Sequence, residues 1–288
     1  MAIAFLGPRG TNSEEAAILH RGADAAMIAV PSISALVSAV ETSIADEAVL
    51  PIENSIEGPI STTLDLLIHE TGLNVVGEVV VPIRHVLISV PGASLDDITT
   101  VISHPQGLAQ CRRFLERFLG KAEQVTWLST AGAVEDVVTV GDPTRAAIGP
   151  ERAQELYGGE VIARDIQDIR GNLTRFVVLS KGTTEPTGYD KTMIAYTVKE
   201  NVPGILFKTF QPFAKRGIQL TKIESRPVKG ELGLYVFLLD FEGHQKDPEI
   251  ADVISEVREL VKDFKVFGSF PRFPLETYNH LFTTPALL

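Results

Sequence analysis

The sequence predicts an α/β protein made of two parts, a larger N-terminal part and a smaller C-terminal part. In the first 180 residues, short apolar runs alternate with helical patterns, which is the order that produces sheets with parallel strands. A segment rich in Gly, Thr and Pro follows, and the pattern after it is strand, helix, strand, strand, helix, strand. That second order is typical of the ferredoxin-like sandwich.

In the first part, each predicted strand leads into a helix or a further strand. "IAFLG" predicts a strand, and "TNSEEAAILH" a helix whose start has capping-box spacing, either Thr11 with Glu14 or Asn12 with Glu15. "AVLPIENS" and "TTLDLLIHET" predict a second strand and helix, and Pro82 interrupts the β-rich stretch "GEVVVPIRHVLISV". "TVISHPQGLAQCRRFLERFL" and "AAIGPERAQELY" each predict a strand, a loop and a helix.

Four loops in this part each lie between a predicted strand and the next helix. They are "GPRGT", "PIENS", "SHPQ" and "GPERA". Open α/β sheets bind ligands beyond the carboxyl ends of their strands, in such loops. We therefore expect the functional site among these four segments.

The C-terminal part begins after a predicted linker, "KGTTEPTGYDK". "TMIAYTV" predicts a strand, and "PGILFKTFQPFAKRG" a helix that ends at Gly217 although Pro212 lies inside it. "IQLTKIESR" and "LGLYVFLLDFEG" predict a hairpin, and "KVFGSF" a closing strand. Between them "DPEIADVISEVRELVKDF" predicts a helix with one apolar face, formed by Ile250, Val253, Ile254, Val257, Leu260, Val261 and Phe264.

Composition narrows the class of protein. The chain has 288 residues, 44% of them hydrophobic and 22% charged, which is typical of a globular protein of about two domains. Its net charge of -11 argues against nucleic-acid binding, which needs a basic face. The single cysteine, Cys111, excludes an internal disulfide framework, and no apolar run reaches the roughly 18 residues of a membrane span. Without a recognisable signal peptide, the expected location is cytoplasmic.

Five motifs in this order give the chain a resemblance to the prephenate dehydratase family along nearly its whole length. They are "GPRGT", "PIENSIEGPISTTLD", "SHPQGLAQC", "GNLTRF" and "IESRP". The resemblance implies a two-lobed catalytic domain similar to type II periplasmic binding proteins, followed by a ferredoxin-like ACT regulatory domain. The expected limits are 1–181 for the catalytic domain, 182–191 for the linker, 192–270 for the ACT domain and 271–288 for a tail. Within the catalytic domain, lobe one is expected at 1–76 and 166–181, and lobe two at 77–165.

The resemblance also implies a reaction, which is the conversion of prephenate to phenylpyruvate with loss of water and carbon dioxide. Aromatisation drives that reaction, so no redox cofactor or metal is expected. Prephenate carries two carboxylates, which Arg and helix N-termini can hold. By resemblance, Thr174 assists the departing hydroxyl and Arg175 beside it binds a substrate carboxylate. Without the motif, Thr174 reads as the first residue of a strand, because β-branched residues favour strands.

Further substrate-binding residues are expected around the same motifs. Glu53 is either a solvated charge or, since a carboxylate repels a dianion, a residue of the site that orients Asn54, Ser55 or Arg175. Asn54 and Ser55 either bind substrate or cap a helix, and Asn172 either binds substrate or caps a turn. The remaining expected residues are Thr11, Ser103, Gln106 and Phe176, of which Phe176 is also a candidate for packing beneath the site.

Two reactive side chains near "SHPQG" are not expected to do chemistry. His104 is a lone loop histidine beside Pro105, and a structural role is favoured over proton donation. Cys111 shares a helical face with Leu108, Leu115, Phe118 and Leu119, which favours the core over a nucleophile.

In ACT domains of this kind, the effector lies near the start of the first helix and the "ESRP" corner. The resemblance therefore implies phenylalanine as the effector and a homodimer or homotetramer as the assembly. Gly204 can offer a free N–H to an amino-acid carboxylate, and Glu224 either meets the ammonium or pairs with Arg226. The other expected effector residues are Ile205, Leu206 and Ser225.

Three alternatives stay open or are excluded at this point. Arogenate dehydratase is the nearest alternative reaction, and an amino-acid sensor without chemistry is an alternative of another class. A nicotinamide or nucleotide enzyme is excluded, because no Gly-x-Gly-x-x-Gly loop follows the first strand.

Overall fold

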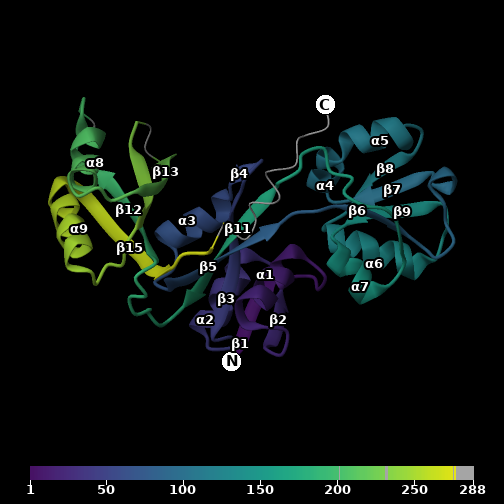
Figure 1. The fold of residues 1–288 in the computed structure, drawn as a ribbon, viewed down its shortest axis with the longest axis horizontal. Coiled ribbons are helices and arrows are strands. Elements are labelled where there is room, and N and C mark those ends of the chain that lie inside the picture. Colours follow the sequence, from purple (N-terminus) through teal and green to yellow (C-terminus); the bar gives the residue numbers. More distant parts are fainter. Residues whose placement is uncertain (201, 231–232, 275, 277–288) are drawn as a thin grey trace.

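The computed structural model describes residues 1–200, 202–230, 233–274 and 276. Three sheets lie in a row along the long axis of the molecule, with the first lobe in the middle (Figure 1). The second lobe lies at one end, and the C-terminal domain at the other end (Figure 1). No helix in the described ranges is long and apolar enough to cross a membrane.

The sheet of lobe one has parallel and antiparallel strands. Its order is β2 (Ala26–Val30), β1 (Ala2–Leu6), β3 (Glu47–Asn54), β11 (Leu173–Ser180) and β5 (Asn74–Pro82), with the short β4 (Gly58–Pro59) against β3. β1 runs parallel to β2 and β3, as predicted from the βα alternation, whereas β11 runs antiparallel to both β3 and β5. The late strand β11 thus lies between two strands from the first third of the chain.

Helices cover both faces of this sheet. α1 (Asn12–Arg21) packs on one face, over Ile3, Phe5 and Val178, and α2 (Ile33–Glu41) and α3 (Ser61–His69) pack on the other. Thr11 caps α1 by accepting from the N–H of Glu14, as the capping-box spacing predicts.

A buried carboxylate anchors the other end of α1. Glu47 of β3 accepts from His20 Nε2 at 2.9 Å and from Arg21 Nε at 2.7 Å. Burial opposes ionisation of Glu47, but the hydrogen bonds from His20 and Arg21 outweigh it and lower its pKa to about 2.

Lobe two contains the second sheet, in the order β10 (Glu160–Ala163), β6 (Val86–Ser89), β9 (Arg145–Gly149), β7 (Thr100–Ser103) and β8 (Glu123–Thr126). β7 runs parallel to β8 and β9, and β6 runs antiparallel to β9 and β10. α4 (Pro105–Gln110) and α5 (Arg112–Phe118) cover one face, and α6 (Thr130–Val140) and α7 (Glu151–Tyr157) cover the other. A short η1 turn (Leu95–Asp97) precedes β7.

Two segments cross between the lobes, after β5 and before β11. The predicted lobe boundary at residues 76 and 77 is wrong, because β5 pairs with β11 as far as Pro82. Pro82 ends the strand, as its missing N–H requires. The lobes also touch directly: the Tyr157 hydroxyl donates to the Arg9 carbonyl at 3.0 Å, and a Cβ at Gly10 would lie 3.0 Å from the Cα of Ala153. Glycine at position 10 permits this approach.

The C-terminal domain has the predicted βαββαβ order. Its elements are β12 (Asp190–Val198), α8 (Ile205–Lys215), β13 (Leu220–Pro227), β14 (Tyr235–Glu242), α9 (Pro248–Leu260) and β15 (Val261–Pro271). The antiparallel sheet has the order β13-β14-β12-β15, and α8 and α9 pack on one of its faces. The ferredoxin-like prediction is therefore confirmed, including Pro212 inside α8.

The other face of this sheet packs on lobe one (Figure 1). Met193, Leu238 and Phe267 share one apolar core with Leu67 of α3 and Val177 of β11. Lys265 adds two hydrogen bonds across the boundary, to the carbonyls of Leu67 and Thr71. The C-terminal domain thus contacts the strand that bears the "GNLTRF" motif.

Two helix predictions need correction. α9 ends at Leu260, so Val261 and Phe264 belong to β15. The helix predicted through "QGLAQCRRFLERFL" breaks at Cys111, which turns Phe118 to solvent with half of its surface exposed. Cys111 itself is buried in the core of lobe two, as predicted, and burial raises the pKa of its thiol.

Candidate functional site

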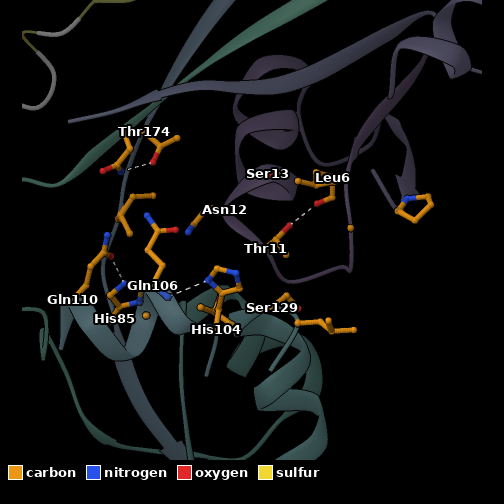
Figure 2. Close-up of a pocket in the computed structure, with 17 residues that line it drawn as sticks. Leu6, Thr11, Asn12, Ser13, His85, His104, Gln106, Gln110, Ser129 and Thr174 are labelled. Carbon is orange, nitrogen blue, oxygen red and sulfur yellow. Dashed lines mark hydrogen bonds between the residues drawn. The ribbon is translucent and has the colours of Figure 1, made fainter. Parts of the chain in front are cut away.

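A cleft of about 360 Å³ opens between the two lobes. Three of the four predicted loops reach it, and "GPERA" lies outside, along a neighbouring depression. Figure 2 shows side chains of lobe one and lobe two facing each other across this space. The lining residues are Leu6, Gly7, Thr11, Asn12, Ser13, Pro31, Asn54, Ile83, His85, His104, Gln106, Gly107, Gln110, Leu128, Ser129, Thr130 and Thr174. The volume suits a small-molecule ligand.

Asn54 fixes the orientation of the Thr174 hydroxyl. The Oδ1 atom of Asn54 accepts from the backbone N–H groups of Ile56 and Glu57, both at 3.0 Å, so its Nδ2 must face the other way. Nδ2 donates to Thr174 Oγ1 at 2.9 Å and to Asn172 Oδ1 at 2.7 Å. Because Thr174 Oγ1 already accepts from Asn54, its own proton is available to donate.

Two helices point their N-termini into the cleft from opposite lobes. Asn12 and Ser13 are the first residues of α1, and Ser129 and Thr130 are the N-cap and first residue of α6. The N–H groups of a first helical turn attract negative charge. The cleft therefore offers an anion two sets of backbone donors, one from each lobe.

His85 and His104 are the two lining residues with ionisable side chains. Among the described residues that line the cleft, none is Lys, Arg, Asp or Glu. Within the described ranges, no group of three His, Cys, Asp or Glu side chains is placed to hold a metal ion. An anionic ligand here is thus met by dipoles and hydrogen-bond donors.

His85 is a lining residue that the sequence analysis missed. Its Nε2 lies 2.9 Å from Gln110 Oε1, and Gln110 Nε2 lies 3.4 Å from a carboxylate oxygen of Glu57. This network assigns the ring proton to Nε2. Burial lowers the pKa of His85, and the hydrogen bond to Gln110 opposes that shift only in part. Nδ1 is buried and has no hydrogen-bond partner among the described residues.

Arg175 does not lie beside Thr174 at the cleft, so its expected role as a substrate ligand needs correction. Successive residues of a strand point to opposite faces. Thr174 lines the cleft, whereas the Arg175 guanidinium lies 2.7 Å from a carboxylate oxygen of Glu78 and 2.5 Å from one of Asp240 in the C-terminal domain. Burial disfavours the charged guanidinium, but Asp240 and Glu78 outweigh it and raise its pKa.

Several other expected residues support the site from outside the cleft. Ser103 is fully buried and donates to the Ile148 carbonyl, and Phe176 is buried in the core beneath the sheet, next to α1. Ser55 accepts from the N–H of Leu173, and Glu53 pairs with Lys222 on the face away from the cleft.

Asn172 is also outside the lining set. It is buried at the edge of a smaller depression and contacts Asn54, Ser55 and Gln110. Of the expected substrate residues, the structure thus brings Thr11, Asn54, Gln106 and Thr174 to the cleft. His104 also lines it and caps α4 by accepting from the N–H of Gln106 at 3.2 Å.

The expected effector residues divide between the two faces of the C-terminal sheet. Gly204 precedes α8 with a left-handed φ of 82°, and Ile205 and Leu206 pack in the helical layer. Ser225 is exposed on β13. Glu224 and Arg226 alternate with Ser225 and face lobe one, where Arg226 lies 3.0 Å from Asp65. Glu224 and Arg226 are therefore interdomain residues in this chain.

Two of the lining residues that sequence reasoning missed come from the start of a helix that was not predicted. Ser129 and Thr130 open α6, whose Ala- and Val-rich sequence has little amphipathic contrast. The one available signal is Ser129, which caps the helix by accepting from the N–H of Gly132. His85 and Gln110 give no sequence signal, because their contact joins residues 25 positions apart.

Comparison with known proteins places this geometry in a family. The sequence model of the prephenate dehydratase family matches residues 3–184, and that of the ACT domain matches residues 192–259. A bifunctional chorismate mutase/prephenate dehydratase of Aquifex aeolicus is 39% identical over 274 residues, which is 95% of this chain and 74% of the relative.

Two solved structures are also similar over nearly the whole chain. The prephenate dehydratase of Arthrobacter aurescens in complex with L-Phe has a TM-score of 0.85 at 36% identity, covering 94% of this chain and 90% of that one. GqqA, described as a novel type of quorum quenching acylase, has a TM-score of 0.86 at 30% identity, covering 96% and 100%. The chain therefore belongs to the prephenate dehydratase family, with an ACT domain after its catalytic domain.

Proposed function

We propose that this protein is a carbon–oxygen lyase that converts prephenate to phenylpyruvate, with loss of water and carbon dioxide. One observation carries the proposal. The Thr174 hydroxyl is held by Asn54 as a hydrogen-bond donor, inside a cleft flanked by two helix N-termini. That arrangement matches a dianion that must lose a hydroxyl group.

The chemistry follows from the substrate. The bond between the ring and its carboxylate breaks, its electron pair enters the ring, and the bond to the ring hydroxyl breaks as the ring becomes aromatic. Thr174 donates a hydrogen bond to the departing oxygen, which leaves as hydroxide and takes up a proton from solvent to become water. A threonine hydroxyl is a weak acid, so its contribution is to stabilise developing negative charge on that oxygen.

The two substrate carboxylates should be bound with different strengths. One leaves as carbon dioxide, so a strong interaction with it would stabilise the ground state and slow the reaction. The other stays in the product, and its binding positions the ring. The N-termini of α1 and α6 suit the retained carboxylate, and the apolar lining from Leu6, Ile83 and Leu128 suits the carboxylate that is lost.

The direct test mixes the protein with prephenate, without any added cofactor, and follows phenylpyruvate by absorbance against a sample without protein. Turnover of prephenate supports the proposal. Faster turnover of arogenate would replace it with arogenate dehydratase. Binding of either compound without turnover would support the sensor alternative, and in that case Thr174→Ala would change nothing but affinity.

We also propose phenylalanine as the effector, a cytoplasmic homodimer or homotetramer, and domain limits near those of the sequence prediction, with lobe one extended to Pro82. The L-Phe complex of the Arthrobacter aurescens relative supports the effector. On the ACT domain, Gly204–Leu206 and Ser225 are the proposed contacts. The exposed side chains of Phe207 and Ile223 offer a second copy apolar surface. Calorimetry with phenylalanine and light scattering test the effector and the assembly.

A further inference from the structure

The two faces of β11, the strand that carries Thr174, contact different parts of the molecule. Along β11, Thr174 lines the cleft, and Phe176 and Val178 pack toward α1. The alternate residues Val177 and Leu179 share a core with the ACT domain. Arg175 points to that same ACT side, as its pairing with Asp240 of β14 shows. Residues 174 and 175 therefore connect the cleft to the ACT sheet through one peptide bond.

Arg175 lies in a cluster of charged side chains, called here the interdomain cluster, in which every member except Glu53 is mostly buried. It consists of Glu53, Glu78, Arg175, Lys191, Lys222 and Asp240, three anions and three cations. Glu78 accepts from Lys191 at 3.0 Å through both oxygens, and Lys222 lies 2.9 Å from Glu53. Glu53, Glu78 and Arg175 come from lobe one, and the other three come from the ACT domain.

The cluster is tight but incompletely satisfied. The side chains of Glu78 and Asp240 are 3% and 1% exposed, and that of Arg175 is 13% exposed. Nevertheless, Arg175 Nη2 and Asp240 Oδ1 are buried without a hydrogen-bond partner among the described residues. Buried polar atoms usually find partners, so this cluster has unused donors and acceptors with which to form a second arrangement.

The pairing of β11 with β3 is irregular beside Arg175, whereas its pairing with β5 stays in register from Leu173 to Val178. The register between β11 and β3 shifts between Arg175 and Phe176, where Arg175 pairs with Glu53 and Phe176 with Pro51. The extra residue, Ile52, belongs to β3, so the bulge interrupts the ladder and bends β3 beside Arg175. On this side, the contacts of Arg175 with Glu53 and Asp240 supplement an irregular ladder.

We propose that Arg175 is a positioning residue, and that its pairing with Asp240 is the contact through which the ACT domain acts on Thr174. This inference rests on the proposed function and deepens its regulation. A movement of β14 displaces the carboxylate of Asp240, Arg175 follows it, and the adjoining Thr174 hydroxyl changes its position relative to Asn54 and the bound ligand.

A second ion pair at the same interface supplies a matched control. Arg226 of β13 lies 3.0 Å from Asp65 of α3, and Lys229 lies 3.3 Å from the same carboxylate. This contact joins the same two domains and reaches β11 only indirectly, through Glu224, Lys222 and Glu53. Asp65→Asn and Asp240→Asn make the same chemical change, and each removes one interdomain carboxylate.

The experiment compares wild type, Asp240→Asn and Asp65→Asn in the full chain. Inhibition of prephenate turnover by phenylalanine is the first readout, with phenylalanine affinity measured by calorimetry. Hydrogen exchange of residues 172–178, with and without phenylalanine, is the second readout and needs no turnover. In Asp240→Asn we expect the fold-inhibition at saturating phenylalanine to fall about tenfold or more, within the usual range of allosteric coupling. We also expect unchanged phenylalanine affinity and no exchange response in β11, whereas Asp65→Asn keeps both responses.

Three results would overturn the inference. One is wild-type inhibition retained in Asp240→Asn, and another is equal loss of inhibition in Asp65→Asn. The third is a wild-type protein in which phenylalanine neither binds nor changes exchange in β11. If prephenate is not turned over at all, the proposed reaction fails, while the exchange readout still decides the coupling. Arg175→Lys keeps the charge but reaches only one carboxylate, and it serves the same test should Asp240→Asn not fold.

Discussion

Replacing the Thr174 hydroxyl with a methyl group tests the proposed chemistry most directly. Thr174→Val keeps the branched shape of a side chain that is 8% exposed, so it opens no cavity. The Nδ2 atom of Asn54 loses one acceptor but keeps Asn172 Oδ1 at 2.7 Å and the Leu173 carbonyl at 3.3 Å. No buried donor is left unpaired, so we expect the variant to fold.

The two expected magnitudes are well separated. Loss of one hydrogen bond lowers the free energy of unfolding by about 1 kcal/mol. Loss of a donor to the departing oxygen lowers kcat by about 10²–10³, which raises the activation barrier by about 3–4 kcal/mol. The effect on turnover should therefore exceed the effect on stability several times over.

The assay follows phenylpyruvate formation at saturating prephenate, with urea unfolding of the same samples. Thr174→Ser, which keeps the hydroxyl on a side chain with a freer χ1, is the matched control and should retain more activity than Thr174→Val. A Thr174→Val protein with nearly wild-type kcat would refute the role of the hydroxyl. So would a loss confined to KM, because the hydroxyl would then bind substrate and transition state equally.

Three further predictions address the surrounding residues. Asn54→Asp replaces the donor to Thr174 with an acceptor, so the hydroxyl turns toward residue 54 and kcat should fall at least as far as in Asn54→Ala, measured by the same assay. The amide of His85→Gln can place a donor near the Nε2 position, facing Gln110, whereas the shorter side chain of His85→Asn cannot. We therefore expect kcat to be up to about tenfold lower in His85→Asn than in His85→Gln. Equal kcat values in the two variants would contradict this expectation. Glu47, whose pKa is about 2 in the folded protein, should contribute about 3 kcal/mol of stability above its ordinary pKa, lost as the pH falls from about 5 to 2. Urea unfolding across that pH range should show a shallower loss in Glu47→Gln, and parallel curves would refute the assignment.

Much of the architecture could be predicted from local patterns. The βα alternation and the βαββαβ order are visible because apolar periodicity and turn residues are local properties. The antiparallel insertion of β11 between β3 and β5 could not be seen, because it joins residues more than 90 positions apart. β8 was also missed, since three of its four residues are exposed and its sequence, "EQVT", has no apolar run.

The site was predicted less completely than the fold. Thr174 was found through its motif, but placing Arg175 at the same ligand conflicted with the strand predicted there, whose neighbouring side chains must diverge. The partner of Arg175, Asp240, lies 65 residues away in another domain. His85 and Gln110 meet only because a crossing segment passes the end of α4.

Because the lining of the cleft contains no Lys, Arg, Asp or Glu among the described residues, it affects how the proposed product is released. A guanidinium clamp attracts a carboxylate across a wide separation and would keep hold of the product as the lobes part. Amide dipoles at the ends of α1 and α6 act only at close range. Their hold on the proposed ligand fades within a few ångströms, so a small separation of the two lobes would be enough to free the proposed product.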